Sequence, residues 1–254
     1  MERDLLFAHE LADAADAITL ARFRSLELRV ETKPDLTPVS DADRAAEEAV
    51  RSLVAASGRS EGVVGEEGGD SGGGGATVAR WIVDPIDGTR NYVRGLPVWA
   101  TLLALERDGV VDVGLVSAPA LVRRWWAVRG EGAWADGSRC AVSAVATVED
   151  AVVSTTSARD MPGGWQALTA RAWAERSFSD FWQYCLVAEG SVDLAADETL
   201  QLWDYAAVQL IVTEAGGRCS TLSGGAVSPG ASFLATNGLL HDEAITALRG
   251  QNRS

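Results

Sequence analysis

Apolar residues recur at three- and four-residue spacing over residues 3 to about 24. This period predicts an amphipathic helix, which Lys33-Pro34-Asp35 would separate from the next element. A second segment, rich in Ala and Glu, runs to about Ala56, and either Ser40 or Asp41 is placed to act as its N-cap. The pattern therefore predicts two helices at the start of the chain.

Shorter apolar runs follow, punctuated by turn residues. Strands are predicted at 62–65 and 79–84, on either side of a glycine-rich run from Gly68 to Gly75, and a strand meander from 97 to about 134. The remainder alternates between strands near 151–155, 192–195 and 233–236 and helices at about 165–173, 181–188, 203–215 and 239–248. This order predicts a layered α/β or α+β protein, with no internal repeat and no linker long enough to separate domains.

The composition and net charge of the chain restrict the kinds of ligand that it is expected to bind. The 254 residues are 47% hydrophobic, which is enough for a full core, and the net charge is −14 with Lys33 as the single lysine. A chain this acidic is not expected to grip nucleic acid or an anionic membrane, because both need clustered Lys and Arg. A small phosphate ester remains compatible if metal ions supply the positive charge.

The cysteines and the first residues indicate the cellular compartment in which the protein is expected to work. Cys140, Cys185 and Cys219 form an odd set without CxxC spacing, which favours buried reduced thiols over a zinc site or a disulfide framework. The first residues are acidic and lack an apolar signal region, and no apolar run approaches the ~18 residues of a membrane span. A cytoplasmic location is expected.

The most informative segment follows the predicted strand 79–84. Asp84-Pro85-Ile86-Asp87 presents two carboxylates at the strand end, and Gly88 and Thr89 add backbone donors and a hydroxyl. Two acids beside such donors indicate a site that binds metal ions and acts on a phosphate group. Asp-Pro and Asp-Gly are also common turn pairs, which is the alternative explanation.

Two further acidic clusters could complete such a site. Glu66 and Glu67 follow a predicted strand, and the ordinary explanation for such a pair is a solvated loop. Asp204 opens a predicted helix, where the ordinary explanation is a capping role. Together with Asp84 and Asp87, they place hard oxygen ligands at the ends of rigid elements. The two histidines are distant in sequence, which favours magnesium or manganese over zinc.

Four motifs resemble the inositol monophosphatase superfamily, in its order and spacing, over essentially the whole chain. They are Thr37–Asp43, Gly65-Glu66-Glu67, Asp84–Thr89, and Trp203-Asp204 with the trailing Glu214–Gly217. The resemblance implies a magnesium-dependent and usually dimeric phosphatase with a layered αβαβα sandwich of the inositol monophosphatase and sugar phosphatase type. It also implies a single domain over 1–254, built of two intimate subdomains at roughly 1–145 and 146–254.

Ligand roles come from the same resemblance. A first metal would be held by Glu66, Asp84 and the carbonyl of Ile86, and a second by Asp84, Asp87 and Asp204, so that Asp84 bridges. Two cations ~3.5–4 Å apart would stabilise the entering and leaving oxygens of an in-line displacement. Two to three Mg²⁺ are expected in the site, with Mn²⁺ as a possible substitute.

Catalytic roles are implied in the same way. Thr89, polarised by Asp43, would orient and deprotonate the attacking water, and Glu67 would support the ligands or a weaker third metal. The backbone amides of Gly88 and Thr89 would bind the phosphate. For Asp43, a first-turn carboxylate on the second helix is the alternative.

The leaving alcohol is indicated by a departure from the inositol-binding pattern. Where members that bind inositol phosphate usually carry a small Gly-Ser/Thr-Ala stretch after an Arg, this chain reads Arg176-Ser177-Phe178-Ser179-Asp180. A carboxylate there suits a cationic alcohol better than a neutral polyol, and Asp197 could add a second acceptor. The expected substrate-binding residues are Asp87, Arg176, Ser179, Asp180 and Asp197. Alternatively, Asp180 is the N-cap of the helix that follows.

The same stretch, with Asn91–Thr101, Arg123–Trp126 and Trp182–Gly190, resembles the histidinol-phosphatase branch of the superfamily. This resemblance implies hydrolysis of histidinol phosphate in histidine synthesis. An inositol-type or broad-specificity phosphatase is the first alternative, and a metal-binding regulatory protein without turnover is the second. The aromatic pair Trp125-Trp126 is expected in the core or in a dimer interface.

Overall fold

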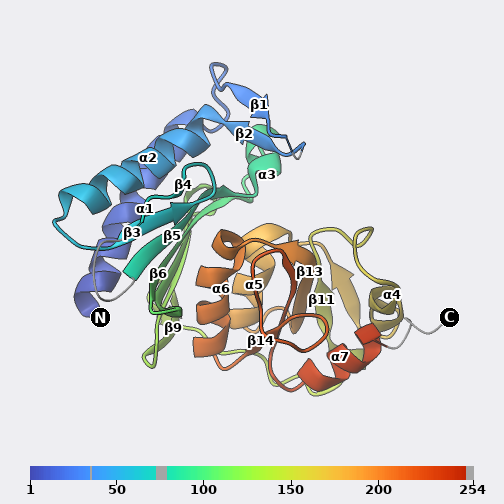
Figure 1. The fold of residues 1–254 in the computed structure, drawn as a ribbon. Helices are drawn as coiled ribbons and strands as arrows, with labels where there is room; N and C mark the ends of the chain where they lie inside the picture. The colour runs from blue at the N-terminus through green and yellow to red at the C-terminus, as the bar shows by residue number, and fades with distance from the viewer. Residues whose placement is uncertain (35, 73–78, 250–254) are drawn as a thin grey trace.

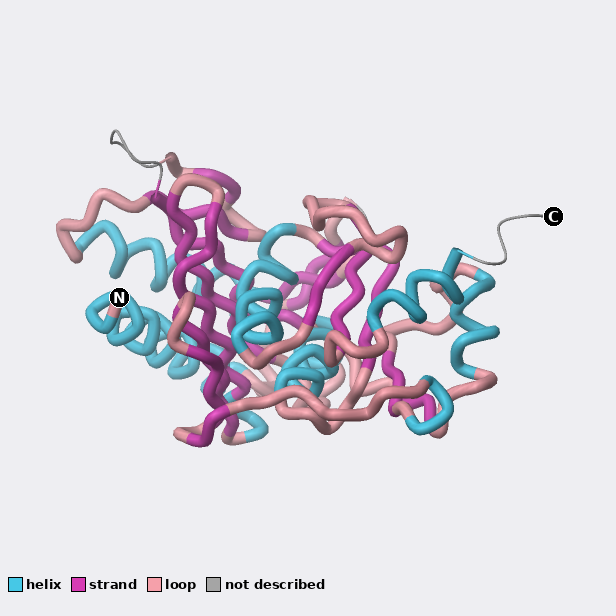
Figure 2. The backbone as a smooth tube through the Cα atoms, turned by 90° about the horizontal axis from the view of Figure 1, so that it is seen from below, coloured by secondary structure: helices cyan, strands magenta, loops and turns pink. Residues whose placement is uncertain are grey.

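The computed structural model describes residues 1–34, 36–72 and 79–249, and they stack in five layers of helices and sheets (Figure 1). Two helices cover a large sheet, two more lie between this sheet and a smaller one, and a last pair of helices covers the smaller sheet. The view from below shows the same alternation (Figure 2). The layered αβαβα sandwich that the resemblance implied is confirmed.

The large sheet has eight strands in the order β10-β9-β8-β7-β6-β5-β3-β4, with β3 and β5 parallel and the other pairs antiparallel. Its strands are β3 (Gly62–Gly65), β4 (Gly69–Asp70), β5 (Ala79–Asp87), β6 (Ala100–Arg107), β7 (Val110–Ala118), β8 (Arg123–Val128), β9 (Gly132–Ala135) and β10 (Ser138–Arg139). The strands from β6 to β9 form the predicted meander.

Helices α1 (Glu2–Arg22) and α2 (Asp41–Ala56) lie on the outer face of this sheet. The start of α2 is fixed locally, because Ser40 is its N-cap and forms a reciprocal capping box with Asp43. Its apolar stripe, which includes Val50 and Val54, packs with α1 and the sheet in one core cluster. Of the two N-cap candidates, the structure selects Ser40.

The middle layer consists of α5 (Asp180–Ala188) and α6 (Leu202–Glu214), buried against both sheets. Both helices are apolar around most of their circumference, as a helix enclosed on two sides requires. The approach of α6 to β7 is close: a Cβ added to Gly114 would lie 2.8 Å from the carbonyl oxygen of Ala207. The backbone of α6 therefore packs directly against β7 at this point, where a side chain would not fit.

The smaller sheet has the order β12-β11-β13-β15-β14. Its strands are β11 (Val152–Ser154), β12 (Ala174–Arg176), β13 (Leu194–Leu200), β14 (Arg218–Ser220) and β15 (Ala231–Thr236). Helices α4 (Gly163–Thr169) and α7 (His241–Arg249) close its outer face around buried Trp165 and Leu234. The short elements are β1 (Val30–Thr32), β2 (Pro38–Ser40), α3 (Thr89–Val93) and the 3₁₀ turns η1 (Pro119–Leu121) and η2 (Val148–Asp150).

Some predicted bounds differ from the structure. Helix α4 ends at Thr169 rather than near residue 173, and Trp173, which suggested the longer helix, is 71% exposed. Strand β13 runs on to Leu200 through an irregularity in its pairing with β15. The pattern missed β1, β2, β4, β10, β12 and β14, each of two or three residues, because so short a run carries no measurable period. Residues 73–75 of the glycine-rich run lie outside the described residues.

The cysteines and the tryptophan pair occupy the places expected of core residues. All three cysteines are free; Cys140 and Cys185 are buried and Cys219 is partly buried. Burial raises the pKa of the Cys140 thiol to about 11, so it stays protonated and unreactive at neutral pH. Trp125 is fully buried, and Trp126 packs at the edge of the core beneath α1.

Candidate active site

A bulge at the end of β5 turns two carboxylates to one side of the large sheet. Asp84 pairs with Leu102 and Asp87 with Ala100, so three steps along β5 correspond to two along β6. Without the extra residue, side chains three apart would point to opposite faces; with it, both face the side of α6. The hydroxyl of Thr101 donates to the carbonyl oxygen of Pro85, 2.8 Å away, and so satisfies a polar group that the bulge exposes.

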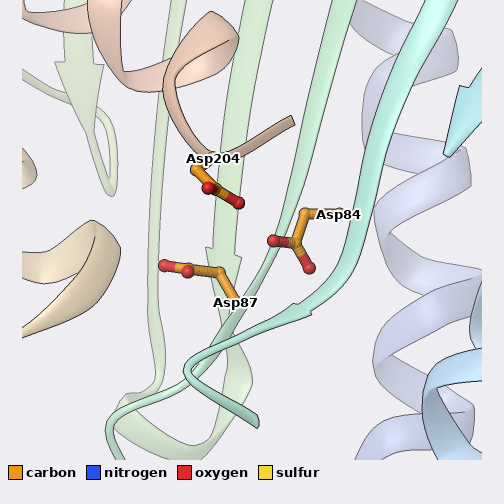
Figure 3. Close-up of side chains that lie close together, drawn as sticks. All are labelled: Asp84, Asp87 and Asp204. Atoms are coloured by element: carbon orange, nitrogen blue, oxygen red, sulfur yellow. The ribbon is translucent and has the colours of Figure 1, made fainter. Parts of the chain in front are cut away.

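Helix α6 brings the third carboxylate. Asp204 is the third residue of this helix, and its carboxylate accepts from the backbone N–H of Gln201 at 2.6 Å as half of a capping box. One carboxylate oxygen from each of Asp84, Asp87 and Asp204 lies within 4.8 Å of the others. Figure 3 shows Asp84 and Asp204 directed toward each other, with the Asp87 carboxylate beneath Asp204. Asp204 therefore belongs to the capping box of α6 and to the acidic cluster at the same time.

The electrostatics of this cluster call for a cation. Burial, followed by the charges of Glu66 and Asp87, raises the pKa of Asp84 well above its ordinary value. Burial also raises the pKa of Asp204 to about 7, and burial with the charges of Asp180 and Asp204 raises that of Asp87. Carboxylates that repel one another this strongly are stabilised in the ionised form by a bound divalent cation. An all-oxygen donor set fits magnesium or manganese.

Asp84, Asp87 and Asp204 line a cavity of about 610 Å³. Glu66, on the turn after β3, lies in the wall of the same cavity. Lys33, on the turn between β1 and β2, lies 2.7 Å from a carboxylate oxygen of Glu66 and also pairs with Glu67. Burial alone would lower the pKa of Lys33, but these ion pairs raise it, so the ammonium stays charged. The single lysine of the chain thus neutralises part of the acidic wall.

Helix α3 opens directly after the acidic strand end. Gly88 is its N-cap with φ of 82°, in the left-handed region that favours glycine. The hydroxyl of Thr89 lies 2.9 Å from the carbonyl oxygen of Ile86 and 3.3 Å from a carboxylate oxygen of Asp43. Asp43 also accepts from the backbone N–H of Ser40, so it is a first-turn capping residue and a neighbour of Thr89 at once.

A second cavity, of about 430 Å³, adjoins the first and shares Asp87, Asp180 and Asp204 with it. Asp180 begins α5 but is not its N-cap; that position belongs to Ser179. The alternative reading of Asp180 is therefore wrong, and the N–H of Phe181 instead donates to Asp87 at 2.6 Å. The carboxylate of Asp180 accepts from the side-chain amide of Asn91 at 2.9 Å.

Of the predicted substrate-binding residues, Asp197 lies at the site and Arg176 does not. Asp197 lines the second cavity, but its carboxylate already accepts hydrogen bonds from Thr155, Thr156, Gln183 and Tyr184. Arg176 is exposed on β12 and is absent from the walls of both cavities. Among the described residues, the structure therefore gathers every other predicted site residue around or beside the acidic cluster, but not Arg176.

Several residues of the site were not found from the sequence. Arg90 lines both cavities, and Arg159 lines the larger one. Glu198 and Asp160 add acidic side chains to the smaller cavity. Arg90 follows Thr89 directly and could have been included with that motif; the other three stand in segments without any local signal.

The comparisons with known proteins agree with this geometry. The sequence profile of the inositol monophosphatase family matches residues 1–253. The chain belongs to the inositol monophosphatase family. It is similar to the histidinol-phosphatase of Mycobacterium tuberculosis, with 52% identity over 96% of this chain and 97% of that protein. The histidinol-phosphatase of Streptomyces coelicolor is 51% identical over 95% of each chain.

The fold comparison extends the agreement to solved structures. The extragenic suppressor protein suhB from Bartonella henselae superposes with a TM-score of 0.91 at 29% identity, covering 98% of this chain and 99% of that one. Family membership and these relatives make the chain a phosphatase, and enzymes of this family are metal-dependent. None of the described helices combines the length and the apolarity needed to cross a bilayer.

Proposed function

We propose that the chain hydrolyses L-histidinol phosphate to L-histidinol and phosphate, using magnesium ions held by its acidic centre. The observation that carries the proposal is an acidic cavity directly beside the carboxylate cluster, in a family member about half identical to two proteins named histidinol-phosphatase. The proposed place of the reaction is histidine biosynthesis in the cytoplasm.

The metal ligands would be Glu66, Asp84, the carbonyl oxygen of Ile86, Asp87 and Asp204. All five line the 610 Å³ cavity. When bound, two to three magnesium ions, or manganese in their place, would neutralise these ligands and withdraw charge from the phosphoryl oxygens. One oxygen of Asp87 accepts from the N–H of Phe181 at 2.6 Å, which restrains the orientation of the carboxylate.

Thr89 and Asp43 would activate the attacking water. A hydroxyl carries one proton, so Thr89 donates either to Ile86 or to Asp43. When it donates to Asp43, its oxygen is free to accept a hydrogen bond from water and orient the lone pair of that water toward phosphorus. Burial, partly offset by hydrogen bonds from Ser40, raises the pKa of Asp43 to about 6, so it is ionised and able to accept at neutral pH.

The phosphate would be bound at the start of α3. The first amides of a helix have no intrahelical partner, so those of Gly88 and Thr89 are available to an anion. Arg90 lines both cavities and adds a positive charge beside this anion. Glu67, paired with Lys33, would support the neighbouring ligands rather than contact the ester.

The leaving alcohol would occupy the 430 Å³ cavity. Its wall combines the rings of Phe181 and Tyr184 with the acids Asp160, Asp180, Asp197 and Glu198. Histidinol carries an ammonium and an imidazole, which match an acidic and aromatic wall through charge-assisted hydrogen bonds and ring contacts. A neutral polyol would leave this charge unbalanced, which argues for a cationic alcohol.

We also propose that the protein forms a homodimer and that each chain works as one unit. The intimate subdomains, roughly 1–145 and 146–254, each contribute part of the cluster: Asp84 and Asp87 come from the first and Asp204 from the second. The metal held by Asp84, Asp87 and Asp204 would then need both halves of the chain.

The test is phosphate release from histidinol phosphate and from inositol 1-phosphate, measured side by side with Mg²⁺ and with EDTA. We expect magnesium-dependent turnover with a strong preference for histidinol phosphate. A preference for inositol phosphate, or equal rates, would support an inositol-type or broad-specificity phosphatase instead. No turnover on either ester would support a metal-binding protein without activity.

A further inference from the structure

Helix α2 carries two buried carboxylates one turn apart, Asp43 and Glu47. Residues four apart lie on the same face of a helix, so both side chains leave α2 toward the site. Asp43 faces Thr89, as described above. Glu47 faces the turn that carries Glu66 and Glu67, and neither the sequence motifs nor the proposed mechanism gives it a role.

Glu47 binds the backbone of this turn at two points. One carboxylate oxygen accepts from the N–H of Glu67 and the other from the N–H of Gly68, each at 2.8 Å. The side chain is only 3% exposed and also pairs with Arg51 at 2.8 Å. A buried charge with three partners of this quality is a fixed element rather than a mobile side chain.

The chain around Glu47 is shaped to admit its carboxylate. A Cβ added to Gly65 would lie 2.3 Å from the Glu47 carboxyl carbon, and one added to Gly68 would lie 2.7 Å from its oxygen. Arg51 donates in addition to the carbonyl oxygens of Val63 and Gly69, on either side of the turn. The two glycines of the Gly-Glu-Glu-Gly segment therefore make room for a carboxylate from α2.

We propose that Glu47 is a positioning residue for metal binding: it holds the Glu66–Glu67 turn in its ligand-presenting conformation without touching the metal itself. The inference rests on the proposed role of Glu66 as a ligand. Glu66 and Glu67 are adjacent like charges whose repulsion Lys33 offsets only in part, since one ammonium pairs with two carboxylates; the remaining repulsion favours opening of the turn. Two backbone hydrogen bonds to a fixed acceptor oppose that opening.

The test compares Glu47→Gln with Glu48→Gln, a control on the same helix whose side chain is exposed. Glutamine keeps the volume of Glu47 but replaces one oxygen with an amino group that cannot accept from the turn. Binding of Mn²⁺ to the purified full chain, without substrate, is measured by the EPR signal of free Mn²⁺. We expect the affinity to fall by ~10–100-fold in Glu47→Gln and to stay within twofold of wild type in Glu48→Gln. Unchanged Mn²⁺ affinity in a folded Glu47→Gln variant would overturn the inference.

Two further measurements test the inference if the Glu47→Gln variant does not fold. Glu47→Asp keeps the charge opposite Arg51 but withdraws the acceptor by one methylene, and its Mn²⁺ affinity should also fall. In the wild-type chain, the amides of Glu67 and Gly68 should be protected from hydrogen exchange even without metal; fast exchange of both would contradict the inference. Because none of these readouts uses a phosphate ester, the inference can fail while the proposed activity stands, and the reverse.

Discussion

The ionisation of Asp43 provides a test of the site that needs no substrate. This carboxylate is 1% exposed, and burial, opposed by hydrogen bonds from Ser40 and reinforced by the charges of Glu67 and Glu66, raises its pKa from 3.8 to about 6. At 1.36 kcal/mol for each unit of pKa, the difference corresponds to about 3 kcal/mol of folding free energy. Screening by solvent does not reduce this figure much, since the group is buried.

The sign follows from proton uptake. Between pH 3.8 and about 6 the folded chain binds the Asp43 proton and the unfolded chain releases it, so the contribution to stability falls as pH rises. It is fully present below pH 3.8 and is lost as pH passes 6. In metal-free protein, the free energy of unfolding of the wild type should therefore decrease across this window by about 3 kcal/mol more than that of Asp43→Asn, which has no proton to lose.

The assay is urea unfolding in EDTA at half-unit pH steps from 4 to 7.5, with wild type and Asp43→Asn in parallel. Raised carboxyl groups whose pKa has other causes, such as Asp204, contribute equally to both curves, so the difference between the curves reports Asp43 together with the smaller effect of its charge on the pKa of Asp84. Parallel curves would refute the reasoning, because they would mean that the carboxylate ionises in the folded chain at its ordinary pKa.

Three substitutions extend the test. Asp87→Asn should lower phosphate release by about 10³-fold, because a metal ion supplies several kcal/mol of charge stabilisation and 1.36 kcal/mol is tenfold in rate; its melting curve should be near that of wild type, and retained activity would remove Asp87 from the ligands. Asp180→Asn should lower kcat/KM for histidinol phosphate about tenfold more than for a neutral ester, since a charge-assisted hydrogen bond contributes ~1.5–3 kcal/mol; equal losses would make Asp180 structural. Gly88→Ala should destabilise the fold by more than the ~1–2 kcal/mol of left-handed strain, because its Cβ would lie 2.9 Å from the carbonyl oxygen of Val98. Gly109→Ala, with φ of 80° and nothing within 4 Å, is the matched control in urea unfolding, and equal losses would exclude the contact.

Local signals were sufficient for most of the helices and strands and for most of the motif residues. The capping box at Ser40 and Asp43 needs only residues three apart, and the period of α2 needs only its own turns. The pair Asp84 and Asp87 was visible because both acids stand at the end of one apolar run. Family resemblance then joined motifs that no local rule connects.

Other parts of the site depend on contacts between distant segments. Lys33 pairs with Glu66 across 33 residues, and Glu47 holds the Glu67 amide across 20. Neither partner shows in its own neighbourhood that the other will be near. Arg176 was predicted to be a site residue because it is close in sequence to Ser179 and Asp180. In the structure it lies on β12, at the edge of the smaller sheet, and its side chain is exposed.

By itself, the sequence determined the helices and most strands, the acidic character of the site and the residue types able to hold a divalent cation, because each follows from spacing within a few residues. Only the tertiary structure decided that Asp84 and Asp87 face the same way, since that depends on an extra residue in the register of β5 against β6. It also decided that Asp204 meets them, since the packing of α6 between two sheets sets that distance. Register and layer packing are properties of paired segments, and no single segment encodes them.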